Sequence, residues 1–367
     1  MVKTAHETGD QVSAPGLSTP GDNLMIGLDV GSTTVKAVVV DPLTNEILWR
    51  RYERHHTRQA QKVLEFLQEI EGEFPRSSGK FRIFITGGGG NLLARFVGAK
   101  FIQEVNAVSL AAEQLYPDVG SVIELGGQDA KIIIWFTDPE TGTKRKVPSM
   151  NDKCAGGTGA VIDKISGKLR LSSDDLASLT FGGVEIHPVA GKCGVFAETD
   201  INGLQKQGVM PDQLMASLFE AIVQQNLSVL TRGNTLRPTV LLLGGPNTFI
   251  PSLRDCWKEN IPKIWEERRV YIPEGVDPRD LVFVPENAEY YGAIGAAIYG
   301  KSEEPDVGLY SGTDALNDFI EVGRSKMREA SGDVRLWQTP QELADFKERF
   351  TKKPWLAATF SPGQTVE

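Results

Sequence analysis

The 367-residue chain has few of the residues from which proteins build metal sites and disulfide frameworks. It contains three cysteines and four histidines, and neither a CxxC nor an HExxH motif occurs in it. A small, odd number of cysteines in a long chain argues against a disulfide framework and favours a reducing, cytoplasmic compartment. One chain alone therefore has few cysteine and histidine ligands from which to build a metal site.

Long apolar runs and an excess of positive charge are also missing. No apolar stretch approaches the ~20 residues that span a bilayer, so we expect no membrane segment. The start of the chain has no apolar core and is expected to be a flexible leader, not a secretory signal. The net charge of −9 argues against nucleic acid or an anionic membrane as the main partner.

The composition is that of an ordinary globular protein, with 40% hydrophobic and 24% charged residues. Hydrophobic strands alternate with glycine turns in the first half, and helical spacing predominates after Cys154. We expect four parts: a leader (1–23), an N-terminal lobe (24–148), a C-terminal lobe (149–300) and a C-terminal extension (301–367).

Three strand–glycine-turn elements recur, with the sequences "GLDVGSTTVK", "ELGGQDAK" and "LLLGGPN". Glycines in a tight turn expose backbone N–H groups, which can surround a polyphosphate without steric conflict. Asp29 and Asp129 hold matching places in the first two turns, where a carboxylate can hold Mg²⁺ through water or orient an attacking water. The candidate nucleotide-binding residues are Gly31, Ser32, Thr33, Thr34 and Lys36 in the first turn, Gly126 and Gly127 in the second, and Gly244, Gly245 and Pro246 in the third.

A fourth glycine-rich stretch, "NDKCAGGTGAVID", has Cys154 at the lip of a possible phosphate loop. The loop candidates are Gly156, Gly157, Thr158 and Gly159. Cys193 holds the same kind of place in "GKCGVFAETDI". Both cysteines precede helical patterns, where the helix dipole and free N–H groups favour a thiolate. From the residues alone, they are either ligands or ordinary buried small residues.

Each of three polar residues that are candidates for the nucleotide site has two possible interpretations. Thr158 either donates to phosphate or favours the turn, and Lys36 either reaches phosphate or ends a strand in solvent. Glu104 either belongs to the acidic groups around Mg²⁺ or caps a helix.

The motifs together resemble those of a known superfamily. "IGLDVGSTTVKAVVVD", "IELGGQDAK", "LLLGGPN" and "YYGAIGAA" look like the phosphate-1, phosphate-2, adenosine and final connecting-helix motifs of the actin, heat-shock-70 and sugar-kinase ATPases. Within that superfamily, "GGQDAK", "NDKCAGGTG" and "GKCGVFAETDI" are similar to motifs of the BadF/BadG/BcrA/BcrD-type ATPases. That group includes activators of 2-hydroxyacyl-CoA dehydratases, ATPase subunits of benzoyl-CoA reductase and reductases of double-cubane cluster proteins. The resemblance covers roughly Met25 to Gly300.

The resemblance implies a two-lobed, ribonuclease-H-like α/β fold with mixed sheets and with ATP and Mg²⁺ in the cleft. It implies a homodimer with one bridging [4Fe–4S] cluster, held by Cys154 and Cys193 of each subunit. Such a protein takes an electron from ferredoxin or flavodoxin and uses ATP hydrolysis to deliver it to a partner iron–sulfur dehydratase or reductase. The catalytic candidates are Asp29, Asp129 and Gln128, and the resemblance suggests that Gln128 positions the attacking water.

Other interpretations remain at this point. Four thiolates also suit a bridging zinc ion. A small-molecule kinase of the same superfamily and a non-redox regulatory ATPase are the rival functions. The segments before Leu24 and after Gly300 exceed the compact activator pattern, so the chain is either an extended stand-alone form or a piece of a longer multidomain activase.

Overall fold

A computed structural model describes residues 24–75, 80–138, 140–151, 156–323, 337 and 339–351 of the chain. By its internal contacts the chain forms two compact units, Met1–Asn317 and Asp318–Glu367. The first unit holds every strand in the described residues. Cys154 lies outside the described residues.

The first sheet is mixed and has five strands. They are β1 (Met25–Val30), β2 (Thr34–Val40), β3 (Ile47–Arg54), β4 (Arg82–Thr86) and β5 (Lys100–Phe101), in the order β3-β2-β1-β4-β5. β1 pairs antiparallel with β2 and parallel with β4. Because β1 is buried along its whole length, its sequence is almost continuously apolar.

The second sheet repeats this connectivity. Its strands are β6 (Ser121–Leu125), β7 (Ala130–Thr137), β8 (Lys144–Asn151), β9 (Val240–Leu243) and β10 (Val282–Phe283), in the order β10-β9-β6-β7-β8. β6 pairs antiparallel with β7 and parallel with β9. β6 and β7 belong to this sheet although they precede residue 149, where we expect the second lobe to begin. The exact domain limits stay a prediction.

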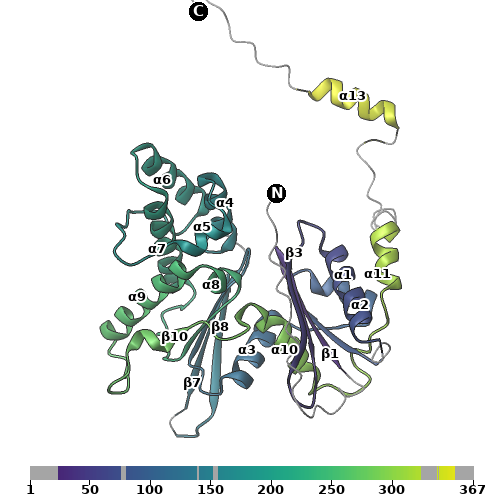
Figure 1. Cartoon of the computed structure of the whole chain (residues 1–367), viewed down its shortest axis with the longest axis horizontal. Coiled ribbons are helices and arrows are strands. Elements are labelled where there is room, and N and C mark those ends of the chain that lie inside the picture. The colour runs from purple at the N-terminus through teal and green to yellow at the C-terminus, as the bar shows by residue number, and fades with distance from the viewer. Residues whose placement is uncertain are drawn as a thin grey trace, which may run out of the picture. The chain divides into compact units, whose positions relative to one another are not determined.

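Two helices, α3 (Glu104–Leu115) and α10 (Tyr291–Gly300), lie between the two sheets (Figure 1). One hydrophobic cluster joins Val38 of β2 to Ile133 of β7 through Ala293 of α10. The two sheets therefore share a core along these helices.

Small residues let α10 make backbone contact with its neighbours. A Cβ atom on Gly295 would stand 1.8 Å from the carbonyl oxygen of Ala107 in α3, and one on Gly27 of β1 would stand 2.0 Å from that of Ala293. Only glycine fits at these two positions, which explains the sequence "YGAIGAA" in a buried helix.

The remaining helices of the first unit cover the sheets. α1 (Gln59–Glu73) and α2 (Gly90–Val97) pack against the first sheet. The second lobe carries α4 (Gly159–Leu169), α5 (Ser173–Ser178), α6 (Gly194–Lys206), α7 (Pro211–Val229), α8 (Gly245–Phe249) and α9 (Pro251–Glu267). Its core includes Ile132 of β7, Phe219 of α7 and Trp257 of α9.

The chain after α10 returns to the first sheet. Arg82 donates hydrogen bonds to the carbonyl groups of Glu303, Glu304 and Val307, at 2.7 to 3.2 Å. The hydroxyl of Tyr310 lies 2.7 Å from Glu71 Oε1 in α1. The first part of the expected extension is thus packed on the first lobe.

Helix α11 (Asp314–Asp318) ends the first unit and begins the second. Within the second unit, a π-helical turn covers Phe319–Gly323, and α13 (Pro340–Phe350) begins at a capping box formed by Thr339 and Glu342. None of the described helices has both the length and the apolarity to cross a membrane. The two mixed sheets and their helices confirm the expected two-lobed, ribonuclease-H-like α/β fold.

Candidate functional site

The turn between β1 and β2 carries a buried ion pair. Asp29 and Lys36 are opposite each other in the hairpin register, with Lys36 Nζ 2.8 Å from Asp29 Oδ2. The two side chains are 10% and 12% exposed. Burial acts to lower the pKa of Lys36, but its anionic neighbours, Asp29 first, raise it above the usual value. Gln59 of α1 supports the turn by donating to the carbonyl of Gly31 over 3.0 Å.

A second buried lysine, Lys131 on β7, gathers three carboxylates. Its Nζ lies 2.8 Å from Glu104 Oε2 and 3.2 Å from Glu124 Oε2, and it also pairs with Asp129. Burial raises the pKa of Glu104 to about 7, Lys131 opposes that shift, and the carboxylates of Asp29 and Asp129 add to it. The group is one coupled electrostatic unit.

These charges line a cavity of about 280 Å³ between the lobes, which Gln128 also borders. Four carboxylates face it, from Asp29, Glu104, Glu124 and Asp129, together with the two ammonium groups of Lys36 and Lys131. The excess of carboxylate suits a divalent cation, and oxygen ligands with water are what Mg²⁺ prefers. Among the described residues, no three acidic, histidine or cysteine side chains converge as direct ligands of a metal ion, so the cavity suits a Mg²⁺ ion that is held through water.

A larger cavity of about 410 Å³ continues from the smaller one. The two share the walls formed by Thr33, Thr34, Lys36, Glu124, Gly126 and Gly127. Farther along, the larger cavity is lined by Gly244, Gly245 and Pro246 and by the apolar side chains of Leu176, Phe249 and Ile250. A polyphosphate fits the shared, glycine-rich part, and a flat apolar base fits the far end.

The turns of the two lobes face each other across this cleft. A Cβ atom on Gly127 would stand 2.2 Å from the Thr33 hydroxyl, and one on Gly245 would stand 2.3 Å from the Tyr52 hydroxyl. Larger residues at either glycine would push the lobes apart.

The start of α4 is hydrogen-bonded to the second turn. The Thr158 hydroxyl donates to the Gly127 carbonyl over 3.1 Å, and the Gly159 and Ala160 amides donate to the carbonyls of Gly126 and Gly127 over 3.0 and 2.7 Å. Thr158 is fully buried. A shift of the turn is therefore transmitted directly to α4.

Only part of the expected phosphate loop borders the cleft. Gly159 lines the larger cavity, whereas Gly156, Gly157 and Thr158 line neither cavity. Gly157 has φ +81°, and its carbonyl accepts from Asn226 of α7 over 2.9 Å. Phosphate binding by these residues stays a prediction.

Cys193 is the N-cap residue of α6. The backbone amides of Phe196 and Val195, in the first turn of α6, lower the pKa of Cys193. A Cβ atom on Gly194 would stand 2.8 Å from Val161, so the first turn of α6 packs against α4. Cys193 thus lies next to the helix that follows the other cysteine motif, and its lowered pKa favours the thiolate form.

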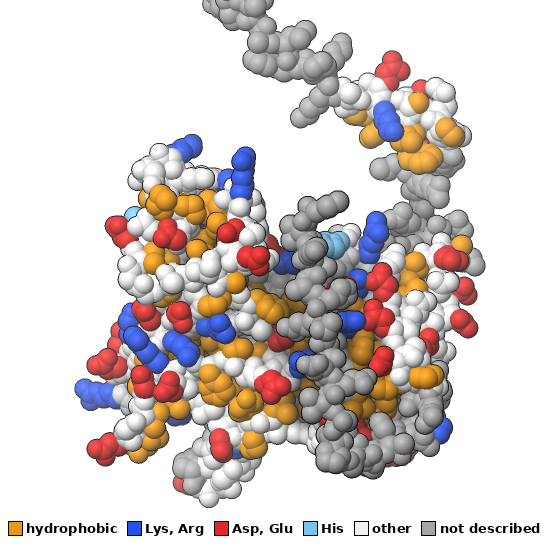
Figure 2. All heavy atoms as spheres, viewed as in Figure 1, with side chains coloured by type: hydrophobic (Ala, Val, Ile, Leu, Met, Phe, Trp, Pro, Cys, Tyr) orange, Lys and Arg blue, Asp and Glu red, His pale blue; other side chains and the backbone are white. Residues whose placement is uncertain are grey.

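The surface beside Cys193 is apolar. Val195 and Phe196 are 62% and 65% exposed, and hydrophobic side chains gather in the region of α4 and α6 (Figure 2). In contrast, Cys256 on α9 is buried, and its sulfur lies 3.3 Å from Glu220 Oε2.

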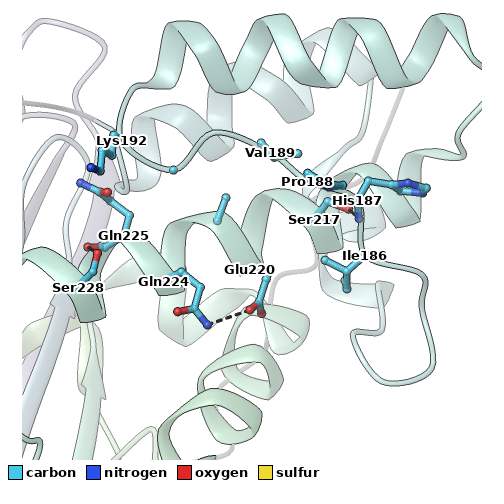
Figure 3. A pocket seen from close by; sticks show the side chains of 12 residues that line it. Ile186, His187, Pro188, Val189, Lys192, Ser217, Glu220, Gln224, Gln225 and Ser228 are labelled. Atoms are coloured by element: carbon cyan, nitrogen blue, oxygen red, sulfur yellow. Dashed lines mark hydrogen bonds between the residues drawn. The ribbon is translucent and has the colours of Figure 1, made fainter. Parts of the chain in front are cut away.

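A third cavity, of about 500 Å³, shares no lining residue with the cleft. It lies where residues 186–192 pass over α7 (Figure 3). Gln224 donates to Glu220 over 3.0 Å along its wall, and the loop is anchored by the His187 amide, which donates to Ser217 over 2.8 Å. None of the predicted nucleotide or ligand residues lies in it.

Five residues that line the cleft are absent from the sequence-based candidates. They are Glu124, Lys131, Tyr52, Arg54 and Asp163. Glu124 and Lys131 lie inside the quoted second motif, and alternation along an extended chain places Asp129 and Lys131 on one face. That signal was available in the sequence. No local pattern marked Tyr52, Arg54 or Asp163.

Comparisons with known proteins identify relatives of this chain. The chain is 30% identical over 278 residues to the uncharacterized protein YjiL of Escherichia coli K12, covering 75% of this chain and 96% of that protein. It is 25% identical over 274 residues to the (R)-2-hydroxyglutaryl-CoA dehydratase activating ATPase of Acidaminococcus fermentans, covering 75% and 95%.

A solved structure shows the same fold. The activator of 2-hydroxyisocaproyl-CoA dehydratase from Clostridium difficile with bound ADPNP matches with a TM-score of 0.60 and 20% identity, over 86% of this chain and all of that one. The model of the BadF/BadG/BcrA/BcrD ATPase family matches residues 26–300, which confirms the expected resemblance. The chain therefore belongs to the BadF/BadG/BcrA/BcrD ATPase family.

Proposed function

We propose that this protein is an ATP-dependent electron-transfer activator that acts as a homodimer on a partner iron–sulfur enzyme. It accepts one electron from reduced ferredoxin or flavodoxin and uses ATP hydrolysis to deliver it at low potential. The proposed partner is of the 2-hydroxyacyl-CoA dehydratase, benzoyl-CoA reductase or double-cubane cluster type. Support comes from the family and from relatives such as the dehydratase activating ATPase of A. fermentans.

The cleft residues take distinct roles in the proposed hydrolysis. Asp29 and Asp129 hold Mg²⁺ through water, with Glu104 at the edge of the same cavity. Lys36 neutralises phosphate charge, and Gln128 orients the attacking water. Lys131 keeps the carboxylates assembled, because without it their mutual repulsion would drive them apart.

One observation carries the link to electron transfer. The Thr158 hydroxyl and the first amides of α4 bind the carbonyls of Gly126 and Gly127, which line the proposed phosphate site. Thr158 lies four positions after Cys154 in the sequence. A change at the γ-phosphate would therefore reach the segment that carries this cysteine through three hydrogen bonds, one from the Thr158 side chain and two from backbone amides.

The described residues supply one of the four thiolates of the proposed site, that of Cys193. Cys193 stands at a helix N-terminus, where the nearby amides lower the pKa of Cys193 and favour a thiolate beside an anionic cluster. Cys154 and Cys193 would hold a [4Fe–4S] cluster together with the same two residues of a second subunit. When bound, the cluster supplies a one-electron carrier.

The proposal is tested by purifying the protein without oxygen and measuring iron, sulfide, mass and the EPR spectrum of the reduced form. We expect a dimer with about four irons. Cys154→Ser and Cys193→Ser should each lose the iron, whereas Cys256→Ser should keep it, because Cys256 is buried beside Glu220. A zinc-containing or iron-free protein that phosphorylates a small molecule would instead establish the rival kinase.

The dimer itself has a separate test. If the surface beside Cys193 is the interface, Phe196→Asp should yield monomers in analytical ultracentrifugation, because a charge would be buried there. Tyr271→Asp is the matched control, since Tyr271 is 81% exposed in the loop after α9. If the Phe196→Asp variant is still a dimer, the interface does not include this surface.

A further inference from the structure

One ion pair in the cleft joins the two lobes through side chains alone. Arg54 at the end of β3 binds Asp163 of α4 with both nitrogens of its fork, Nη1 to Oδ2 at 2.8 Å and Nη2 to Oδ1 at 2.9 Å. Both residues line the larger cavity. The pair therefore bridges the space that a nucleotide would enter.

The helix at the second end of this pair is also tied to α6. Lys164, next to Asp163 in sequence, lies 2.5 Å from Glu198 of α6, and Lys168 lies 3.1 Å from the same carboxylate. α6 begins directly after Cys193. A chain of ion pairs thus runs from β3 in the first lobe to both helices that follow the cysteine motifs.

We infer that Arg54 and Asp163 form a coupling pair, which transmits nucleotide-dependent movement of the first lobe to α4 and α6. The inference rests on the proposed function for its consequence, and it assigns positioning roles to two residues outside the catalytic set. The pair resists opening of the cleft, because it connects β3 of the first lobe to α4 of the second. Both side chains are about half exposed, so the interaction is weak enough to form and break in each cycle.

The first test measures lobe separation, which requires neither iron nor a partner. Spin labels on non-natural residues at Gln68 of α1 and Lys206 of α6 report the distance by pulsed EPR, with labelled chains diluted into unlabelled protein. With ADPNP as the probe, we expect Arg54→Gln to shift the closed-to-open ratio two- to fivefold toward open, the range for an exposed ion pair.

The chain offers a matched control. Arg51 lies on the same strand, is similarly exposed and pairs with Glu69 over 3.0 Å, but that partner belongs to the same lobe. Arg51→Gln should leave the distance distribution unchanged. The exchange Arg54→Asp with Asp163→Arg should restore the original ratio, since it rebuilds the pair with reversed charges.

A second readout uses the anaerobic holoenzyme. The nucleotide-dependent change in the EPR spectrum of the reduced protein should shrink in Arg54→Gln and persist in Arg51→Gln. An unchanged lobe ratio in Arg54→Gln overturns the inference, and so does a loss of ADPNP affinity with unchanged lobe distances, which would make Arg54 a nucleotide ligand. Absence of iron would refute the proposed function while leaving the distance measurement valid.

Discussion

The hydroxyl of Tyr52 in the first lobe occupies the space that a side chain on Gly245 of the second lobe would need. A Cβ atom on Gly245 would lie 2.3 Å from the Tyr52 oxygen. The ring cannot easily turn aside, because it packs against Phe249 and Tyr290 with centroid separations of 5.5 and 6.3 Å.

Gly245→Ala should therefore wedge the cleft and weaken ATP binding about tenfold, since overpacking costs on the order of 1–3 kcal/mol. Titration with ATP by calorimetry measures the change. In a Tyr52→Phe background the same substitution should have little effect, because the clashing oxygen is gone. Equal weakening in both backgrounds would contradict the steric explanation.

Lys131→Ala should be strongly destabilising. It leaves the buried Glu124 and the partly buried Glu104 and Asp129 without their shared cation, and losing one partner of a buried ionic group costs about 3–5 kcal/mol. Urea unfolding gives the free energy, and added MgCl₂ should recover part of the loss. Lys146→Ala is the control: its pair with Glu113 is partly exposed and worth at most about 1 kcal/mol. Equal losses in the two variants would count against the buried cluster.

His55 should make the fold sensitive to acid. The side chain is 6% exposed, its Nδ1 accepts from the Thr57 amide over 3.1 Å, and burial lowers the pKa of His55. The unfolded chain takes up a proton near its ordinary pKa of about 6.5, whereas the folded chain does so only at lower pH. The free energy of unfolding should therefore fall as pH decreases below about 6.5 and level off below the folded-state pKa.

Urea unfolding between pH 7.5 and 5 tests this expectation. The difference between the native chain and His55→Gln isolates the histidine from the titrating carboxylates, and the exposed neighbour His56→Gln serves as the control. A difference that stays constant across this pH range would show that His55 does not contribute.

The segment after Gly300 should contribute to the stability of the first lobe. A chain that ends at Gly300 loses the acceptors of Arg82 and the contact between Tyr310 and Glu71. Compared with a chain that ends at Asn317, it should lose at least about 2 kcal/mol in the free energy of unfolding. Tyr310→Phe in the longer chain should cost about 1 kcal/mol. Identical denaturation midpoints for the two truncated chains would show that the segment is dispensable.

The elements that were predictable from sequence have local signals. The helical spacing after Cys154 predicts a helix in the region where α4 (Gly159–Leu169) lies. The glycine turns follow β1, β6 and β9 because tight turns there require residues without side chains. The position of Asp29 beside the cleft follows from the same motif.

The missed residues have only non-local partners. Arg54 ends β3, an edge strand of the first sheet, and only the tertiary fold brings Asp163 to it from a different lobe. The role of Tyr52 likewise depends on its close contact with Gly245, which is far away in the sequence. A pattern within one segment does not encode such pairings, so sequence reasoning described the turns and not the contacts between them.

The backbone contacts of α10 with α3 and β1 make this region nearly incompressible. The lobes would then rotate relative to each other about this rigid region, and the displacement of a residue would grow with its distance from α10. Small rearrangements around a nucleotide become larger strokes at the remote ends of the lobes. The contacts of Gly27 and Gly295 thus keep the pivot rigid. Substituting either glycine would reduce the movement at the far ends of the lobes without changing a residue that lines the cleft.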